Sequence, residues 1–429
     1  MLAALKSKTA HKVASNTIYQ AVGKLVTMVI TIGITVLVTR MFGREGYGEF
    51  NIMQSFPGIF YIIADFGFNA IATRELSTNW EKANKYFANI LLIRIAIFIF
   101  ISVISYIALA FFPYSESLKF GVRLSLLLIL TQALFATTNI IFQVKLRYDY
   151  SSIGLIIGSL VILGFALLAT NLGWGVVWVN FAYVLGGLVA FIVCLFYANK
   201  LGVRFALEFD KELWKYLFVQ TLPIGLMFIF SQINFRSDSL LLSVLELPER
   251  FNLNNTESVA VYGLPYKIFD VALVIPTFFM NAVYPILVRH MNAGKEQLKA
   301  TFTRATAILL GGGILVGVMG YILAPWMINV LGGAEFSESI AVLRILLAGI
   351  FIFYLTQPVS WLIVTLGKQR YLPYVYVTSA VFNLGLNIWL IPKYSFYASA
   401  YLTWLSEILI FVLLVLFARK SWREKYAKV

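Results

Sequence analysis

Residues 88–111 read ANILLIRIAIFIFISVISYIALAF, and this stretch decides the fold. A helix needs about 20 predominantly apolar residues to cross the hydrocarbon core of a bilayer, and this stretch is long enough. Arg94 is its one charged side chain. A backbone in lipid must satisfy its own hydrogen bonds, so the stretch is expected to be helical. The sequence therefore predicts a membrane-spanning helix at residues 88–111.

Further apolar stretches of this kind occur along the whole 429-residue chain. The twelve predicted spans are residues 16–39, 49–73, 88–111, 122–144, 152–172, 176–198, 217–244, 260–286, 305–325, 340–366, 371–391 and 396–418. The fifth and sixth are separated by little more than residues 171–175, which predicts a tight helical hairpin. We therefore predict an all-α polytopic membrane protein with 12 transmembrane helices.

The composition excludes several classes of protein. The chain is 60% hydrophobic and 13% charged, whereas a soluble domain is about 45–50% apolar and about 25% charged. Soluble enzymes and nucleic-acid-binding proteins are thereby excluded, although the net charge is +14. Cys194 is the single cysteine and there are two histidines, so a disulfide framework or a metal cluster is not expected. The chain lacks a GxxxxGK[ST] phosphate loop, so we expect no ATPase, no cofactor and no catalytic residue.

The distribution of basic residues predicts the orientation. With both termini on one side, 23 lysines and arginines fall in the loops of that side, and 5 fall in the opposite loops. Cytoplasmic loops carry the excess of basic residues in membrane proteins. Both termini are therefore predicted to be cytoplasmic, which requires an even number of membrane spans. The protein is predicted to lie in the inner (plasma) membrane.

The two halves of the chain resemble each other. Gly48 opens the second span and Arg74 closes it, and Gly263 and Arg289 open and close the eighth span at the same spacing. Two further loop matches, after the fourth and tenth spans and after the sixth and twelfth, follow in the same order at a similar offset. This predicts an N-terminal six-helix bundle (1–199), a cytoplasmic linker (200–215) and a C-terminal six-helix bundle (216–429), related by a pseudo-twofold axis along the membrane normal. The alternative is a shared pattern of loops without duplication.

Several ionisable residues fall inside or at the edges of the predicted spans. They are Lys24, Asp65, Arg94, Arg123, Arg236, Asp238, Lys267, Asp270, His290, Arg344 and Glu407. A charge that faces lipid costs several kcal/mol, so these side chains should face a cavity or one another. Three of them, Arg94, Arg123 and Arg344, lie near span ends, where a long side chain can reach the headgroup layer.

Three deep cations are the candidate substrate-binding residues: Lys24, Arg236 and Lys267. Deep cations suit a pyrophosphate, which needs charge compensation out of water. The candidates for ion coupling or ion pairing are the carboxylates Asp65, Asp238, Asp270 and Glu407. The alternative interpretation is that closed pairs, Arg236–Asp270 or Lys267–Asp238, hold the bundle together. Helix breakers in the spans, at Pro57, Pro223, Pro276 and Pro358, predict kinks that line a cavity or act as hinges.

Specific sequence motifs resemble one family. Residues 40–48, RMFGREGYG, are followed by Asp65-Phe-Gly67 and Ala72-Thr-Arg74, and this order resembles the opening signature of the polysaccharide-export branch of the multidrug/oligosaccharidyl-lipid/polysaccharide (MOP) exporter superfamily. Asp238-Ser-Leu-Leu241 before Tyr262-Gly263 is similar to the seventh and eighth spans of that family. Residues 383–387 (NLGLN), with Ile391-Pro392 and residues 398–400 (ASA), are similar to its late span pair.

The resemblance implies a MATE-like, V-shaped transporter of two bundles that alternates between inward-open and outward-open states. Its cargo would be an undecaprenyl-pyrophosphate-linked oligosaccharide, moved from the cytoplasmic to the outer leaflet for synthesis of O-antigen, capsule or exopolysaccharide. Family members carry basic residues in the central cavity, and Lys24, Arg236 and Lys267 are the matching positions. Two alternatives remain: a cation-coupled exporter of small (multidrug) compounds, and a membrane scaffold for glycan assembly that does not transport.

The expected partners follow from the same resemblance. They are the lipid-linked oligosaccharide, membrane lipids, a coupling ion (H⁺ or Na⁺), a glycan polymerase and glycosyltransferases. We expect a monomer that binds no nucleic acid.

Overall fold

The computed structural model describes residues 2–426 of the chain, with side chains from residue 18 onward except at residues 223 and 224. Helices make up almost all of the described chain, and no strand occurs in it. The all-α fold predicted from the apolar stretches is confirmed.

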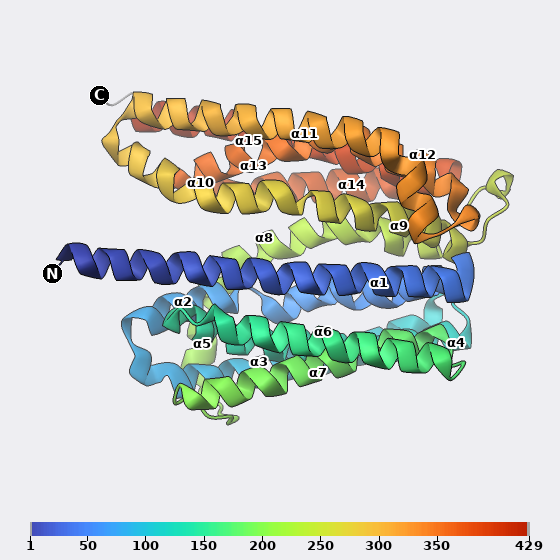
Figure 1. Cartoon of the computed structure of the whole chain (residues 1–429), viewed down its shortest axis with the longest axis horizontal. Helices are drawn as coiled ribbons and strands as arrows, with labels where there is room; N and C mark the ends of the chain where they lie inside the picture. Colours follow the sequence, from blue (N-terminus) through green and yellow to red (C-terminus); the bar gives the residue numbers. More distant parts are fainter. Residues whose placement is uncertain (1, 427–429) are drawn as a thin grey trace. The chain divides into compact units, whose positions relative to one another are not determined.

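The chain forms two compact units (Figure 1). Unit 1 comprises Met1–Phe42 and Ile52–Ile229, and unit 2 comprises Gly43–Asn51 and Phe230–Val429. The α-helices are α1 (Leu2–Asp65), α2 (Phe68–Thr78), α3 (Ala83–Ala108), α4 (Glu116–Ser125), α5 (Leu127–Lys145), α6 (Tyr148–Asn171), α7 (Val176–Lys200), α8 (Lys211–Val244), α9 (Asn255–Ala272), α10 (Val274–Ala293), α11 (Lys295–Leu331), α12 (Ser337–Ala348), α13 (Ile350–Thr365), α14 (Leu372–Tyr394) and α15 (Phe396–Tyr426). Short 3₁₀ helices are η1 (Trp80–Lys82), η2 (Leu109–Phe111), η3 (Glu249–Phe251), η4 (Ala334–Phe336) and η5 (Gln369–Tyr371).

Within the described residues, 10 helical stretches are long and apolar enough to cross a membrane, or up to 11 if the two arms of α8 form one span. The protein is therefore a multi-pass membrane protein. The first stretch, Ile18–Thr78, has 61 residues and contains both of the first two predicted spans. At 1.5 Å per residue it measures about 90 Å, three times the hydrocarbon thickness. Its backbone leaves the helical region at Gly43 (φ 63°, ψ −159°), between those two spans, and the number of twelve spans remains a prediction.

Unit 1 is built around large apolar side chains from several helices. Phe87 and Leu91 of α3, Phe142 of α5 and Leu217 of α8 are all buried in one cluster. The predicted hairpin between the fifth and sixth spans is confirmed, because α6 ends at Asn171 and α7 begins at Val176.

The helix α8 begins at a capped and charged turn. Asp210 lies just before it and accepts a hydrogen bond from the backbone N–H of Leu213 at 3.0 Å. Lys85 pairs with the same carboxylate, and together these contacts hold the pKa of Asp210 below its usual value. The helix then bends by 54° between Leu222 and Gly225. The boundary between the units, at residues 229–230, lies inside this helix. The linker at residues 200–215 and the two six-helix bundles stay predictions.

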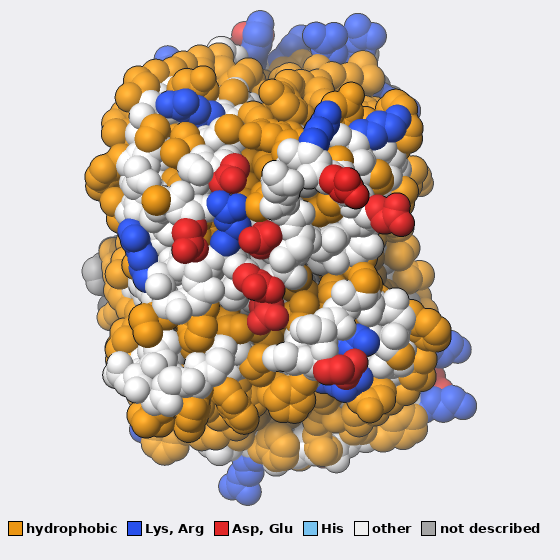
Figure 2. Space-filling model, turned by 90° about the vertical axis from the view of Figure 1, so that its right-hand side faces the viewer, with side chains coloured by type: hydrophobic (Ala, Val, Ile, Leu, Met, Phe, Trp, Pro, Cys, Tyr) orange, Lys and Arg blue, Asp and Glu red, His pale blue; other side chains and the backbone are white. Residues whose placement is uncertain are grey.

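The segment Gly43–Asn51 of α1 belongs to unit 2. Arg44 anchors its start, since its Nη2 lies 2.8 Å from Glu338 Oε2 of α12 and also donates to the backbone oxygen of Glu335. The ring of Tyr47 packs edge-on against Phe336, with 5.9 Å between centroids. Figure 2 shows the side of the molecule on which α9 and α12 are labelled in Figure 1, where acidic and basic side chains occur among hydrophobic ones.

Gly48 allows this segment to touch α9. A Cβ atom on Gly48 would lie 2.0 Å from the backbone oxygen of Thr256, at the start of α9. That first turn is held by a capping box in which Asn254 Oδ1 accepts from Glu257 N at 2.8 Å and Glu257 Oε2 accepts from Asn254 N at 2.9 Å. The backbone of α9 therefore cannot easily move away.

Gly48→Ala is expected to destabilise the protein by about 1–3 kcal/mol, the usual cost of overpacking a close contact. Gly33→Ala, in the same helix, is the matched control, because a Cβ atom there meets no atom within 4 Å. Thermal denaturation of both variants in detergent measures the difference. Equal midpoints for the two variants would contradict the close contact.

Candidate functional site

Two of the predicted substrate-binding cations lie together in unit 2. Arg236 of α8 and Lys267 of α9 are half-buried and interact electrostatically with each other and with Asp270, one turn after Lys267. Among the described residues, neither Arg236 nor Lys267 forms an ion pair within 4.0 Å. The closed pairs Arg236–Asp270 and Lys267–Asp238 are thus not formed in this structure. We call Arg236 and Lys267 the basic pair.

Asp238 follows Arg236 by two residues in α8, but its side chain has different partners. It is 1% exposed, and its Oδ1 accepts from Asn387 Nδ2 at 2.9 Å. Its Oδ2 accepts from the hydroxyl of Tyr262 at 2.7 Å and from Thr403 Oγ1 at 3.4 Å. Within the described part of the chain, no lysine or arginine pairs with this carboxylate. We call Asp238, Tyr262, Asn387 and Thr403 the Asp238 cluster.

Further polar side chains of α14 and α15 support the Asp238 cluster. Asn387 also donates to Asn383 Oδ1 at 3.1 Å and accepts from Ser399 Oγ at 3.0 Å. Asn383 in turn donates to Ser406 Oγ at 3.1 Å. All of these side chains are buried, so the amide and hydroxyl groups hold one another in fixed orientations around the carboxylate.

Sequence reasoning missed the partners of Asp238. The sequence analysis includes Asn383 and Asn387 only as part of a family motif, and it does not single out Thr403. The available signal is their spacing, because Asn383 and Asn387, like Ser399 and Thr403, are four residues apart and share one helical face. Two polar faces at this spacing on neighbouring spans are expected to meet inside a bundle.

In unit 1, Asp65 is an ion-pair residue. Arg94 Nη2 lies 2.6 Å from Asp65 Oδ1, and the side chain of Arg94 is 0% exposed. The prediction that Arg94 extends to the headgroup layer is therefore wrong. Its guanidinium also donates to Ala133 O at 2.9 Å, to Asn69 Oδ1 at 3.0 Å, and to Thr137 Oγ1 and Ala64 O.

These contacts explain why an arginine is buried there. All five N–H groups of a guanidinium donate in fixed directions, and each of the five finds an acceptor around Arg94. One acceptor is the carbonyl of Ala64, beside the break between α1 and α2, where Phe66 (φ 39°) and Gly67 (φ 76°) leave the helical region. Arg94 thus fastens a broken span to α3 and α5.

The other predicted residues take no part in the contacts described above. Lys24 is an exposed residue of α1 in unit 1. Glu407 of α15 is 5% exposed and lies beside Thr356 of α13. Arg123 and Arg344 stack on aromatic rings, at 4.5 Å from the centroid of Tyr106 and at 5.0 Å from that of Tyr321.

Comparison with solved structures shows which known folds this arrangement is similar to. An inward-facing MATE family multidrug resistance transporter of the MOP superfamily matches with a TM-score of 0.75 and 13% identity, over 92% of this chain and 95% of that chain. The lipid II flippase MurJ, in an inward closed conformation, matches with a TM-score of 0.75 and 15% identity, over 95% of this chain and 89% of that chain. A MOP superfamily transporter from Pyrococcus furiosus matches with a TM-score of 0.68 and 15% identity, over 97% and 96%.

Family models give a more specific assignment. The model described as polysaccharide biosynthesis protein matches residues 13–291, and the MatE model matches residues 251–389. A search of curated proteins finds no match. The fold and the family agree with the resemblance of the motifs around Gly48 and Asp238. The chain is a transporter of the MOP exporter superfamily and belongs to the polysaccharide biosynthesis protein family.

Proposed function

We propose that the protein is a flippase that moves a lipid-linked oligosaccharide, carried on undecaprenyl pyrophosphate, from the cytoplasmic to the outer leaflet of the inner (plasma) membrane for cell-surface polysaccharide synthesis. The observation that carries the proposal is the basic pair: two half-buried cations on membrane-spanning helices with no ion-pair partner within 4.0 Å among the described residues. Such cations are costly unless anions compensate them, and Asp270, the carboxylate that interacts with both, can balance only one of the two charges. Membership of the polysaccharide biosynthesis protein family supports an anionic glycolipid as that ligand.

In this mechanism Arg236 and Lys267 bind the pyrophosphate while the prenyl tail stays in lipid. Arginine supplies a planar, bidentate contact and lysine a point charge, and both suit phosphate oxygens. Lys24 of unit 1 is the third basic residue of the proposal. The reaction breaks no bond, so transport requires only binding and a change between inward-open and outward-open states, with both termini in the cytoplasm. The bend of α8 between Leu222 and Gly225 is a candidate hinge for this change.

Asp238 is proposed as the coupling site for H⁺ or Na⁺. A buried carboxylate without a cationic partner is costly unless it takes up a proton or a cation. The Asp238 cluster offers carboxylate, amide and hydroxyl oxygens, which are the ligands that hard cations prefer. A cation bound at the Asp238 cluster would stabilise the folded protein against unfolding by mass action.

Asp238→Asn is expected to abolish the response of transport to an imposed proton or sodium gradient, because the amide can neither ionise nor balance a cation. Asparagine has nearly the same shape, so the variant should fold. Transport rates in proteoliposomes with and without each gradient provide the measurement, and Ser243→Ala, in the same helix, is the control. An unchanged gradient response in the Asp238 variant would refute the coupling role.

A cation-coupled exporter of small organic compounds is the second candidate. It is favoured by the match of the MatE model to residues 251–389 and by the fold of the multidrug transporters. Asp270 and Glu407 would then be further candidates for cation coupling. The non-transporting scaffold has no structural observation in its favour.

A deletion strain separates the two functions. Loss of a flippase should remove a surface glycan and cause its lipid-linked precursor to accumulate, with normal sensitivity to drugs. Loss of a drug exporter should change drug sensitivity and leave the glycan intact. Mass spectrometry of extracted lipids and growth tests on a compound panel give both readouts from the same strain, and the second pattern would contradict the flippase.

A further inference from the structure

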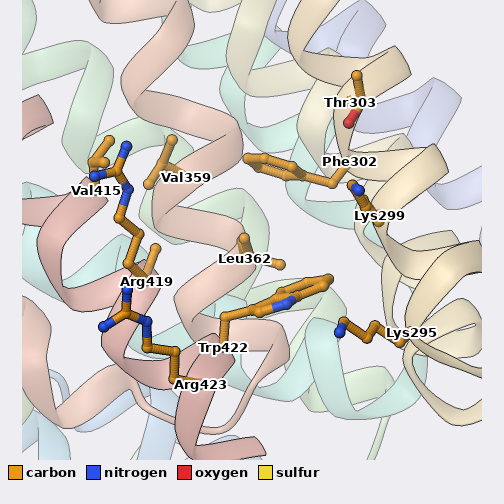
Figure 3. Close-up of a pocket in the computed structure, with 11 residues that line it drawn as sticks. Lys295, Lys299, Phe302, Thr303, Val359, Leu362, Val415, Arg419, Trp422 and Arg423 are labelled. Carbon is orange, nitrogen blue, oxygen red and sulfur yellow. The ribbon is translucent and has the colours of Figure 1, made fainter. Parts of the chain in front are cut away.

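Four basic side chains line one cavity in unit 2 (Figure 3). The cavity has a volume of about 550 Å³ and lies between α11, α13 and α15. Lys295 and Lys299 contribute from α11, and Arg419 and Arg423 contribute from α15. None of its eleven lining residues is acidic. A volume of this size is typical of sites for small molecules.

The four cations of this cavity form no close ion pairs within the described part of the chain. Among the described residues, none of the four cations forms an ion pair, whereas nearby Lys368 pairs with Glu424 at 2.5 Å. Each helix carries its two cations four residues apart, a spacing at which like charges repel. Lys295 also lies at the N-terminus of α11, where the helix dipole disfavours a cation. The four side chains are exposed, and Glu296 also lies in the first turn of α11. An anion held among all four cations would reduce these repulsions further.

The remaining lining residues are largely apolar. Val359 and Leu362 of α13 are buried. In Figure 3, Phe302 and Trp422 lie between the two lysines of α11 and the two arginines of α15. Such a surface does not suit a free, fully hydrated anion. It suits a molecule that joins an anionic group to a hydrocarbon chain.

Helix length places the cavity at the depth of lipid headgroups. The helix α11 has 37 residues and α15 has 31, and both are longer than the about 20 residues that span the hydrocarbon core. The two lysines occupy the first turns of α11 and the two arginines the last turns of α15. Tryptophan prefers this interfacial layer, and Trp422 is found there.

A second cavity in unit 2 provides a contrast. It has a volume of about 840 Å³ and is lined by Arg250 and Arg344 with several aromatic residues. Those arginines are already engaged: Arg250 donates to the backbone oxygen of Lys393, and Arg344 donates to that of Tyr321 at 3.3 Å. Only two cations line this larger cavity, and each is already oriented by a backbone carbonyl, so it is a weaker candidate for an anion site than the first.

We propose that the cavity between α11, α13 and α15 binds an anionic membrane phospholipid. Its phosphate lies among Lys295, Lys299, Arg419 and Arg423, and an acyl chain covers the apolar surface around Leu362. Basic pockets between membrane helices on the cytoplasmic side bind anionic headgroups in this way. The lipid joins the first turns of α11 to the last turns of α15. This site shares no residue with the basic pair and does not depend on the proposed function.

Binding of phosphatidylglycerol to the purified full-length protein tests the proposal, with phosphatidylcholine as the uncharged comparison. Native mass spectrometry gives the bound fraction at each lipid concentration. Wild type is expected to prefer phosphatidylglycerol. The variant Arg419→Gln/Arg423→Gln should lose about 30-fold in that preference, at about 1 kcal/mol for each basic side chain. The control Lys420→Gln/Lys425→Gln removes the same charge from the same helix outside the cavity and should stay close to wild type.

Three results would overturn the proposal. One is an equal loss in the pocket variant and its control. Another is displacement of phosphatidylglycerol by inorganic phosphate at the same concentration, which indicates a site for a free anion. The third comes from wild type alone and does not depend on how the variants fold: a photoactivatable phosphatidylglycerol should label peptides containing Lys295–Leu331 or Phe396–Tyr426, and labelling confined to other peptides contradicts the site.

Discussion

Replacing Arg94 by leucine is expected to lower the free energy of unfolding by about 3–5 kcal/mol, the cost of breaking a buried ion pair by removing one partner. The loss is large because the substitution strands several acceptors at once. The Asp65 carboxylate, 2.6 Å from Arg94, would be left without its cation, and the side chain of Asn69 and the backbone oxygen of Ala133 would lose their donor. Thermal or urea denaturation in detergent measures the change.

The double variant Arg94→Leu/Asp65→Leu is the control for this interpretation. Apolar residues in place of both partners of a buried pair are often neutral, so the double variant should recover much of the stability lost in the single one. Arg94→Lys should be intermediate, because an ammonium has three donors and cannot reach five acceptors. A single Arg94→Leu variant as stable as wild type would contradict the role of this network.

Removing the basic pair is expected to have the largest effect on transport. Arg236→Ala and Lys267→Ala should each lower the rate about 10- to 100-fold, since hydrogen bonds to charged groups contribute about 1.5–3 kcal/mol. Arg236→Lys keeps the charge and should retain much of the rate if the role is electrostatic. The measurement is the initial rate of lipid-linked oligosaccharide transfer in proteoliposomes.

Arg123→Ala is the matched control for these variants. Arg123 is also a cation at the edge of a predicted span, but its guanidinium stacks on Tyr106 and lies in unit 1. Its removal should leave the transport rate within about twofold of wild type, because Arg123 has no part in the proposed binding site. If Arg236→Ala and Lys267→Ala behaved like Arg123→Ala, the basic pair would have no role in binding the substrate.

Hydropathy was sufficient to predict the all-α fold, because a backbone in lipid has few alternatives to a helix. It did not reveal how the first two predicted spans are connected. They form one continuous stretch, Ile18–Thr78, with a kink at Gly43, and the residues around that kink pack in unit 2. Local sequence does not show this, since the packing depends on contacts with α9 and α12, which lie in the second half of the chain.

The sequence shows which spans carry charged residues, but it does not show their ion-pair and hydrogen-bond partners. Distance from the end of a span suggested that Arg94 reaches the headgroup layer. The structure buries it, because the break at Phe66 and Gly67, between α1 and α2, supplies acceptors that no local pattern shows. Asp238 shows the same limit, since its partners come from α9, α14 and α15.

The most direct test of the proposed function is transfer of a radiolabelled undecaprenyl-pyrophosphate-linked oligosaccharide across proteoliposomes that contain the purified protein. We expect wild type to move the labelled glycan from one leaflet to the other, and expect Arg236→Ala and Lys267→Ala to reduce this movement strongly while Arg123→Ala does not. No transfer by folded wild-type protein under imposed proton and sodium gradients would contradict the account, as would equal transfer by all four proteins.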